Sequence, residues 1–382
     1  MGVKRTFTKR KDIKFNIKGY IMDLKKTILV LAAAALALSA CSGTGKDIAA
    51  LGGADAAAFA TGGEVTKTLK VKDFSRIKSS LYVDIHYTQG AQYKVTVSGT
   101  AGAIAKADFS VSDGTLTIKR KNDNSTVNNG NESNHLWLDI TAPDLNGIDN
   151  NGRMSLQAKT FSPSEFVIDN SGILNISAES IKCKATGDGF SLDNSGRLEL
   201  NSSAITAANA SISNNGILTF NGGKMEIEAT HMDNSGRIDI SGNVKGASAS
   251  ISNNGIFTSG MTFDLAKEYK YDNSGRYDFT GNITAGSIDI SNAGIDSQKT
   301  ELKADALKIG INGRSDYDMG FSGSEAQLEC SGIGTFNLDV DCQKLNVEAS
   351  GRIEVTLSGT ADNTEFTGSG ISNIDTTGLN KF

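Results

Sequence analysis

The side chains that could perform acid–base or nucleophilic chemistry in this chain are mostly carboxylates. The 382 residues include 43 Asp and Glu but only 3 His and 4 Cys. The histidines and cysteines are His86, His135, His231, Cys41, Cys183, Cys330 and Cys342. The histidines are scattered and the cysteines show no CxxC spacing, so we expect no metal, no cofactor and no dense disulfide framework. The sequence leaves the pairing of the last three cysteines open.

Three carboxylates recur at nearly equal intervals, at Asp239, Asp278 and Asp316. Glycoside hydrolysis uses two carboxyl groups about 5–9.5 Å apart, so regularly spaced carboxylates could supply such a pair. A catalytic centre is expected to interrupt a repeat, however, whereas these residues follow one. Whether they can act together depends on the elements that carry them.

Residues 22–41 have the pattern of a secretory signal, with two lysines, an apolar run, small residues and then a cysteine. The last four, Leu38-Ser39-Ala40-Cys41, resemble the lipobox of bacterial lipoproteins. The resemblance implies cleavage before Cys41 and lipid on that residue; the alternative is an ordinary signal peptide. Several acyl chains at ~0.8 kcal/mol per buried CH₂ would make the anchor effectively permanent.

The segments beside this signal have simpler interpretations. Residues 1–21 precede a complete signal that begins at Met22, which indicates an upstream start artefact. Residues 42–63 are rich in Gly, Ala, Thr and Ser and predict a flexible tether. We expect a lipid-anchored protein of the bacterial outer membrane. Residues 42–47 lack the acidic run that marks surface export in lipoproteins of the Bacteroides type, so the periplasmic and surface faces both stay open.

Composition excludes some functions. The formal net charge is −5 and the pI is near 5.4, which gives no general basic footprint for nucleic acid. With 38% apolar residues the chain can form a core, and 42 glycines without a triplet period exclude collagen.

A short turn phrase such as DNSGR or SNNGI recurs twelve times, almost always 19 or 20 residues apart. Its glycines, called the turn glycines below, are Gly152, Gly172, Gly196, Gly216, Gly236, Gly255, Gly275, Gly294, Gly313, Gly332, Gly351 and Gly370. We expect them to supply a left-handed or otherwise strained turn. Four residues before each stands an apolar residue, and apolar residues recur two and four places after most of them, which is strand periodicity.

One strand-turn-strand unit per ~20 residues, with only 2 Pro, predicts a single-stranded right-handed parallel β-helix whose coils stack ~4.8 Å apart. We expect N-terminal coils over 64–147, with a loop at 122–134, and regular repeats over 148–378.

The first eight repeats carry asparagine two residues before the turn glycine. Because side chains two residues apart in a strand point to the same side, these asparagines are expected to face inward with the apolar residues four before the glycine. These residues are Asn150, Asn170, Asn194, Asn214, Asn234, Asn253, Asn273 and Asn292. A polar group inside a coil needs partners, so we predict a structural Asn ladder that bonds coil to coil and caps turn backbone groups. An Asn-lined ligand site is the functional alternative.

The residue after the turn glycine alternates between Arg and Ile, so the true repeat is two coils. We call the following residues the Arg/Ile stripe: Arg197, Ile217, Arg237, Ile256, Arg276, Ile295, Arg314, Ile333 and Arg352. Like charges one coil apart repel by ~0.9 kcal/mol even in bulk water, so alternation could be a structural solution. Alternatively, the stripe is a flat docking surface for another copy, a cell-wall component or a host molecule.

The chain resembles the family of putative auto-transporter adhesins with a head GIN domain. The resemblance covers about residues 65–375. It rests on the paired SG and NG turns, the lipobox and three phrases, FSRI at 74–77, VSDGTLTI at 111–118 and LWLDITAP at 136–143. It implies a fold similar to that of pectin lyases, no recognised catalytic residues, and adhesion.

We therefore expect a non-enzymatic, lipid-anchored binding, adhesion or scaffolding module of the envelope. Its partners would be the membrane through Cys41 and either a second copy or an envelope or host glycan or protein. The alternative is a carbohydrate-active enzyme, a polysaccharide lyase or hydrolase. A groove with converging carboxylates on the outer face would favour the enzyme.

Overall fold

The computed structural model describes residues 64–121, 134–184 and 189–381. They belong to one compact unit, Asp55–Phe382. The predicted start artefact, signal, tether and lipid cysteine lie outside the described residues, as does the predicted loop except Asn134. In the described part of the chain, no helix is long and apolar enough to cross a membrane.

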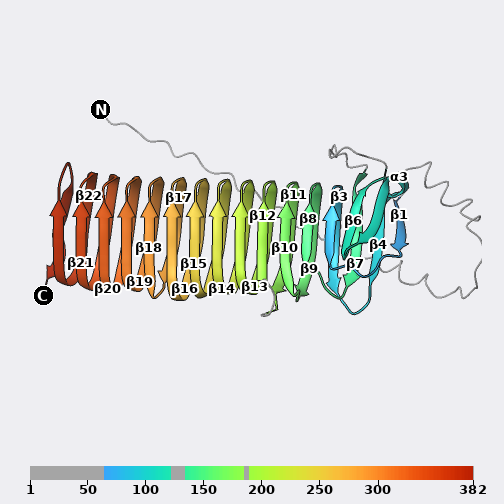
Figure 1. The fold of residues 1–382 in the computed structure, drawn as a ribbon, viewed down its shortest axis with the longest axis horizontal. Helices are drawn as coiled ribbons and strands as arrows, with labels where there is room; N and C mark the ends of the chain where they lie inside the picture. Colours follow the sequence, from blue (N-terminus) through green and yellow to red (C-terminus); the bar gives the residue numbers. More distant parts are fainter. Residues whose placement is uncertain (1–63, 122–133, 185–188, 382) are drawn as a thin grey trace, which may run out of the picture. The chain divides into compact units, whose positions relative to one another are not determined.

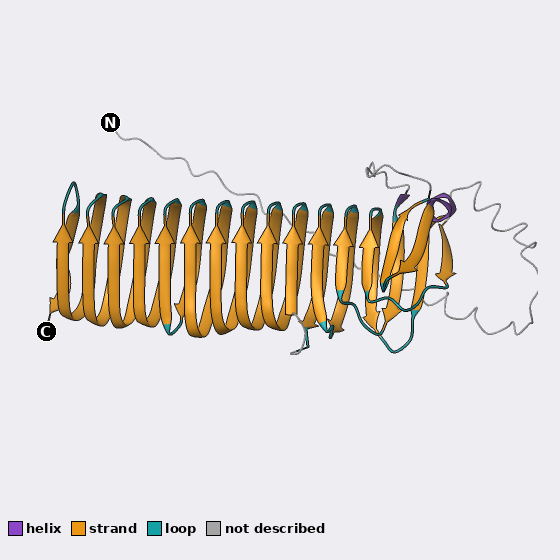
Figure 2. Cartoon of the chain, viewed as in Figure 1, coloured by secondary structure: helices purple, strands orange, loops and turns teal. Residues whose placement is uncertain are grey.

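The described residues form a parallel β-solenoid of about 12 coils, which confirms the predicted fold class (Figures 1 and 2). Its regular part consists of β8 (Gly147–Asn150), β9 (Arg153–Phe161), β10 (Glu165–Asn170), β11 (Ile173–Lys182), β12 (Gly189–Asn194), β13 (Arg197–Asn214), β14 (Ile217–Asn234), β15 (Arg237–Asn253), β16 (Ile256–Asn273), β17 (Arg276–Thr284), β18 (Ser287–Asn292), β19 (Ile295–Ile311), β20 (Arg314–Cys330), β21 (Ile333–Ala349), β22 (Arg352–Gly368) and β23 (Asn373–Lys381).

Each coil has two corners. One is the tight turn at the turn glycine, and we call this side of the solenoid the turn edge; in Figure 2 its loops form a row along one side. The other corner is a bend that most of the later strands follow without a break, and we call this side the bend edge. Equal offsets from the glycine pair in register, as for Arg197 with Ile217 and Asn214 with Asn234. Residues at the same offset from their turn glycines therefore form a line along the solenoid.

The turn glycines are required by close stacking and not by a left-handed turn. A Cβ on Gly216 would lie 2.0 Å from the carbonyl oxygen of Gly196, and the same contact recurs along the turn edge. Of the twelve, only Gly370 has a φ in the left-handed region, at 75°. The expectation of a strained turn conformation was therefore wrong for the others: successive backbones are so close that no side chain fits between them.

The N-terminal part is a capped end. It contains β1 (Glu64–Leu69), β2 (Arg76–Ser79), β3 (Tyr82–Gln89), β4 (Lys94–Thr100), α3 (Ala101–Lys106), β5 (Ala107–Ser112), β6 (Thr115–Arg120) and β7 (Leu136–Ala142). The strands β2 and β3 form one coil beside β8 and β9, and β6 and β7 form the coil beyond it. Antiparallel β4 and β1 continue from β7, and β5 pairs with β6. Of the coils expected over 64–147, two are present, and an antiparallel cap closes the end.

The core is the strip between the two faces of the coils. The predicted apolar column four residues before the turn glycine is buried from Ile148 to Val347, and Phe366 at the C-terminal end is partly buried. The positions two and four residues after the glycine are mostly apolar and buried as well, and the coil of β19 departs most from this pattern. In the coil of β19 these positions hold Asp296 and Gln298, 1% and 3% exposed.

Candidate functional site

The eight predicted asparagines lie inside the solenoid, each at most 4% exposed. Seven side-chain hydrogen bonds of 2.7–2.9 Å connect each Nδ2 to the Oδ1 of the next asparagine. Nδ2 of Asn194 also faces the carbonyl oxygens of Gly196, at 3.2 Å, and Ile217, at 3.1 Å. The amides thus satisfy each other and the turn backbone, which leaves them no free face for a ligand.

The ladder ends beside a buried polar cluster. Nδ2 of Asn292 donates to Oγ of Ser315 at 2.9 Å, in a position where the coils before that of β19 place an apolar side chain. Next to it, Tyr317 OH and Gln298 Nε2 donate to Oδ2 of Asp296 at 2.6 and 2.9 Å, while Oδ1 has no partner among the described residues. Burial raises the pKa of Asp296 to about 7 despite these two hydrogen bonds, which lower it.

The Arg/Ile stripe forms one line along the turn edge. Its members pair in register from coil to coil. Ile217, Ile256, Ile295 and Ile333 are 47–58% exposed. Within residues 64–121, 134–184 and 189–381, the five arginines of the stripe make no ion pair. The stripe is therefore a solvent-facing line of unpaired cations and apolar side chains.

The same line continues into the capped end with aromatic rings. Arg153 pairs with Tyr82 and lies 4.6 Å over its ring centroid. The ring of His135 stacks on Tyr82 at 3.9 Å, and Trp137 packs against His135 at 4.0 Å. Arg153 is thus engaged within the chain by a cation–π contact, unlike the arginines of the stripe.

The carboxylates that suggested catalysis do not converge. Asp239, Asp278 and Asp316 lie in one exposed column, separated by Thr258 and Ser297 in the coils between them. Of the described residues, no three His, Cys, Asp or Glu side chains are placed to hold a metal ion.

The remaining nucleophiles and bases are dispersed. His86, His135 and His231 face one carboxylate each, at 3.5, 3.1 and 2.9 Å. The three described cysteines are unpaired and buried, and burial raises the pKa of Cys183 to about 11 and that of Cys330 to about 12. Burial raises the pKa of Cys342 as well. Such thiols are poor nucleophiles.

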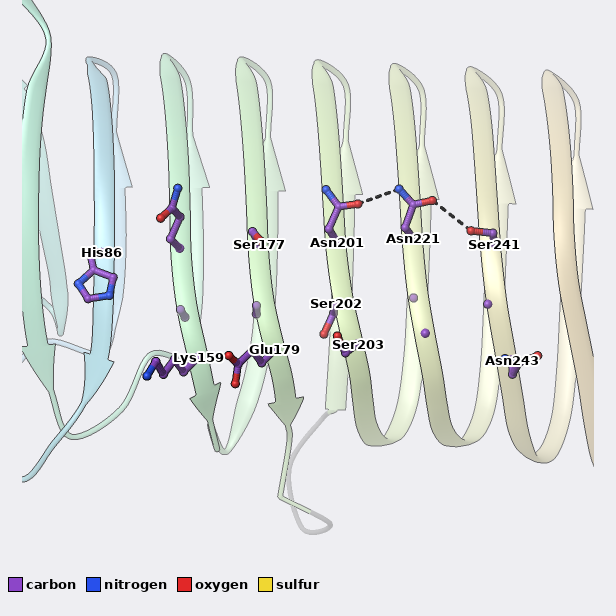
Figure 3. Close-up of a pocket in the computed structure, with 16 residues that line it drawn as sticks. His86, Lys159, Ser177, Glu179, Asn201, Ser202, Ser203, Asn221, Ser241 and Asn243 are labelled. Carbon is purple, nitrogen blue, oxygen red and sulfur yellow. Dashed lines mark hydrogen bonds between the residues drawn. The ribbon is translucent and has the colours of Figure 1, made fainter. Parts of the chain in front are cut away.

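The sequence did not predict a groove of about 670 Å³ on the face that follows the turn (Figure 3). We call it the polar groove. It spans six coils, from β3 to β15, which corresponds to about 24 Å at the spacing of stacked strands. Its residues are His86, Gln157, Ala158, Lys159, Ser177, Ala178, Glu179, Asn201, Ser202, Ser203, Asn221, Gly222, Gly223, Ser241, Gly242 and Asn243.

Small side chains explain why this face is hollow. Six residues after the turn glycine, where the side chain points inward, the five coils from β9 to β15 carry Ala158, Ala178, Ser202, Gly222 and Gly242. The next coil has the buried Met261 at this offset, and there the groove ends. This run of Ala, Ser and Gly was visible in the sequence, but its meaning depends on knowing that the five residues adjoin.

The groove presents neutral hydrogen-bonding groups. Asn221 Nδ2 donates to Asn201 Oδ1 at 2.7 Å, and Ser241 Oγ donates to Asn221 Oδ1 at 3.1 Å, so one line of amides and hydroxyls follows the axis (Figure 3). Among the described residues that line it, Glu179 is the only carboxylate. The described lining therefore lacks the pair of carboxyl groups that glycoside hydrolysis requires.

The family model described as "Putative auto-transporter adhesin, head GIN domain" matches residues 73–324 and 286–381. No curated protein matches the chain.

Among solved structures, the chain is similar to a putative adhesin from Bacteroides fragilis NCTC 9343, at 16% identity over 82% of this chain and 96% of that one, with a TM-score of 0.28. A putative lipid binding protein from Parabacteroides distasonis ATCC 8503 matches at 14% identity over 81% and 96%, with a TM-score of 0.25. Since the family model covers nearly all the described residues, the chain belongs to the family of putative auto-transporter adhesins with a head GIN domain.

Proposed function

We propose that this protein is a non-enzymatic adhesion module of the bacterial envelope that binds a neutral polysaccharide chain along the polar groove. The observation that carries the proposal is the groove itself, in which amides and hydroxyls recur coil after coil. Membership of an adhesin family supports the adhesive role.

The chemistry of the groove favours a neutral, hydroxyl-rich ligand. Of the lining side chains that the structure describes, only Lys159, Glu179 and His86 can carry charge, and all three lie toward the N-terminal end of the groove. Gln157, Asn201, Asn221 and Asn243 each offer both a donor and an acceptor, which matches a sugar hydroxyl in either role. Donors repeating every ~4.8 Å suit an extended polymer that lies parallel to the axis.

The groove predicts weak binding per chain. Besides the imidazole of His86, the residues that line it in the described structure contribute no aromatic ring on which a sugar could stack. Hydrogen bonds exchanged with water contribute only about 0.5–1.5 kcal/mol each. Many copies on one surface would turn weak binding into adhesion through multivalency.

The lipobox supports anchoring of this module to the outer membrane through lipid on Cys41. The residues 42–63 would then hold the groove away from the bilayer. Proteinase treatment of intact cells tests display on the cell surface: loss of the protein is expected for an adhesin, and its retention would place it in the periplasm and contradict adhesion.

Binding is tested by affinity electrophoresis of the full chain through gels that contain neutral or anionic polysaccharides. We expect retardation by at least one neutral polysaccharide and a loss of affinity of roughly fivefold for each of Asn201→Ala and Asn221→Ala, corresponding to about 1 kcal/mol per lost hydrogen bond. Asn337→Ala is the matched control, because Asn337 is exposed at the same offset from its turn glycine but lies outside the groove.

A larger substitution tests the location directly. Ser177→Trp would obstruct the groove, whereas Thr280→Trp occupies the same offset beyond its end. Equal effects of the two variants, or retardation by anionic polysaccharides alone, would refute the proposal. New reducing ends or unsaturated products during incubation would show that the protein is an enzyme.

A further inference from the structure

The Arg/Ile stripe is a line of groups that the chain itself leaves unused. Four isoleucines are about half exposed in alternate coils, and the arginines between them have no ion-pair partner in the described structure. Arg153, at the same offset, is instead held over Tyr82. A regular line of exposed apolar side chains that alternate with unpaired cations indicates an interaction surface.

Carboxylates flank the arginines on both sides of the turn edge. Two residues after each arginine of the stripe stands Glu199, Asp239, Asp278, Asp316 or Glu354, and four residues before four of them stands Asp193, Asp233, Asp272 or Glu348. The coils that carry isoleucine have Ser, Thr or Asn at most of these offsets. Coils that carry both positive and negative groups therefore alternate with neutral, apolar coils, so each kind of coil recurs every ~9.6 Å along the edge.

This pattern argues against several partners. A nucleic acid, an anionic polysaccharide or an anionic lipid surface would meet one or two carboxylates beside every arginine. A neutral glycan would leave the arginines without a counter-charge and the isoleucines without an apolar contact.

A second copy of the chain has what the stripe lacks. Both turn edges have the same two-coil period, so when they face each other in opposite directions one alignment sets every arginine coil opposite an arginine coil of the other copy, whose carboxylates stand beside its arginine. The same alignment sets isoleucine opposite isoleucine. A two-fold axis makes such an interface self-complementary.

We propose that two copies of this protein associate along their turn edges in opposite directions, through the Arg/Ile stripe. The interface lies on a corner of the coil, whereas the polar groove lies on the face that follows it, so the association does not depend on the proposed glycan binding. A narrow line one residue wide per coil makes a reversible dimer.

Sedimentation velocity of the full chain over a range of concentrations, in one mild detergent, tests this inference. We expect a concentration-dependent dimer. The triple variant Ile217→Glu, Ile256→Glu and Ile295→Glu should raise its dissociation constant at least tenfold, because three carboxylates replace the apolar contacts and repel the flanking ones.

The control is Ala266→Glu with Ala306→Glu, which adds charge at exposed positions near the bend edge. Circular dichroism checks that every variant is folded; because all five positions are exposed, we expect native spectra. A charge reversal gives a second readout: Arg237→Glu with Arg276→Glu should also weaken the dimer. A monomer at all concentrations, or a dimer that responds equally to stripe and control variants, would overturn the proposal.

Discussion

Replacing Asp296 by Asn should make the protein more stable at neutral and alkaline pH. Asp296 is 1% exposed, and its Oδ1 has no partner among the described residues. Its neighbours include Tyr317 and Gln298, which donate to it, the buried Tyr271 and Tyr277, and the exposed carboxylate of Asp278. None of them supplies a positive charge, so the ionised form is disfavoured.

The magnitude follows from the pKa of Asp296, which burial raises from 3.8 to about 7. Below pH 3.8 the carboxyl is protonated in both the folded and the unfolded chain, so it adds no pH dependence. Between pH 3.8 and 7 the folded chain holds a proton that the unfolded chain releases, and the free energy of unfolding falls as the pH rises. At about 1.4 kcal/mol per pH unit the loss reaches about 4 kcal/mol above pH 7.

Urea unfolding followed by circular dichroism at pH 5 and pH 8 measures this effect. Asp296→Asn has nearly the same shape, and its Oδ1 can still accept from Tyr317. We expect the wild type to lose stability between the two pH values relative to the variant, and the exposed Asp316→Asn to behave like the wild type. Parallel pH dependences of wild type and Asp296→Asn would refute the reasoning.

Three further predictions concern the turn edge, the ladder and the thiols. Gly216→Ala should destabilise the chain by about 2–4 kcal/mol in urea unfolding, because its Cβ would lie 2.0 Å from a backbone oxygen, whereas Gly310→Ala, with no atom within 4 Å, should be nearly neutral; similar effects would contradict the stacking argument. Asn214→Ala should cost about 1–3 kcal/mol by leaving buried ladder groups unsatisfied, and an unchanged melting temperature would contradict this. The buried Cys330 should react with a thiol reagent only in denaturant, so rapid reaction of the native protein would contradict its burial.

The regular coils could be predicted because each offset from the turn glycine has one environment. Ile212 and its equivalents are apolar in every repeat, which identifies the side chains that face the core. Asn214 stands two residues further along the same strand, so its side chain was expected to point to the same side. The reason for the turn glycines was interpreted wrongly. Sequence alone does not distinguish a glycine that needs a strained φ from one, such as Gly216, that lies so close to the backbone of Gly196 that no Cβ fits.

Other parts of the molecule depend on contacts that no repeat reveals. The antiparallel β1, β4 and β5 lie where the turn phrase is absent, so no offset could be assigned there. The polar groove arises because five small residues from separate repeats adjoin, and Met261 ends it. Asp296 does break an apolar offset in the sequence, but only the structure shows that its oxygens are inside the core.

The alternation of Arg and Ile along the turn edge restricts how such a gene can lengthen. Duplication of an arginine coil or deletion of an isoleucine coil would set two guanidinium groups side by side, and the converse changes would set two isoleucines side by side. Duplication of two adjacent coils would preserve the alternation of Arg and Ile. The carbonyl oxygen of each new turn glycine would also lie against the turn glycine of the next coil, as in the existing coils. We therefore expect natural length variants of this protein to differ by about forty residues at a time.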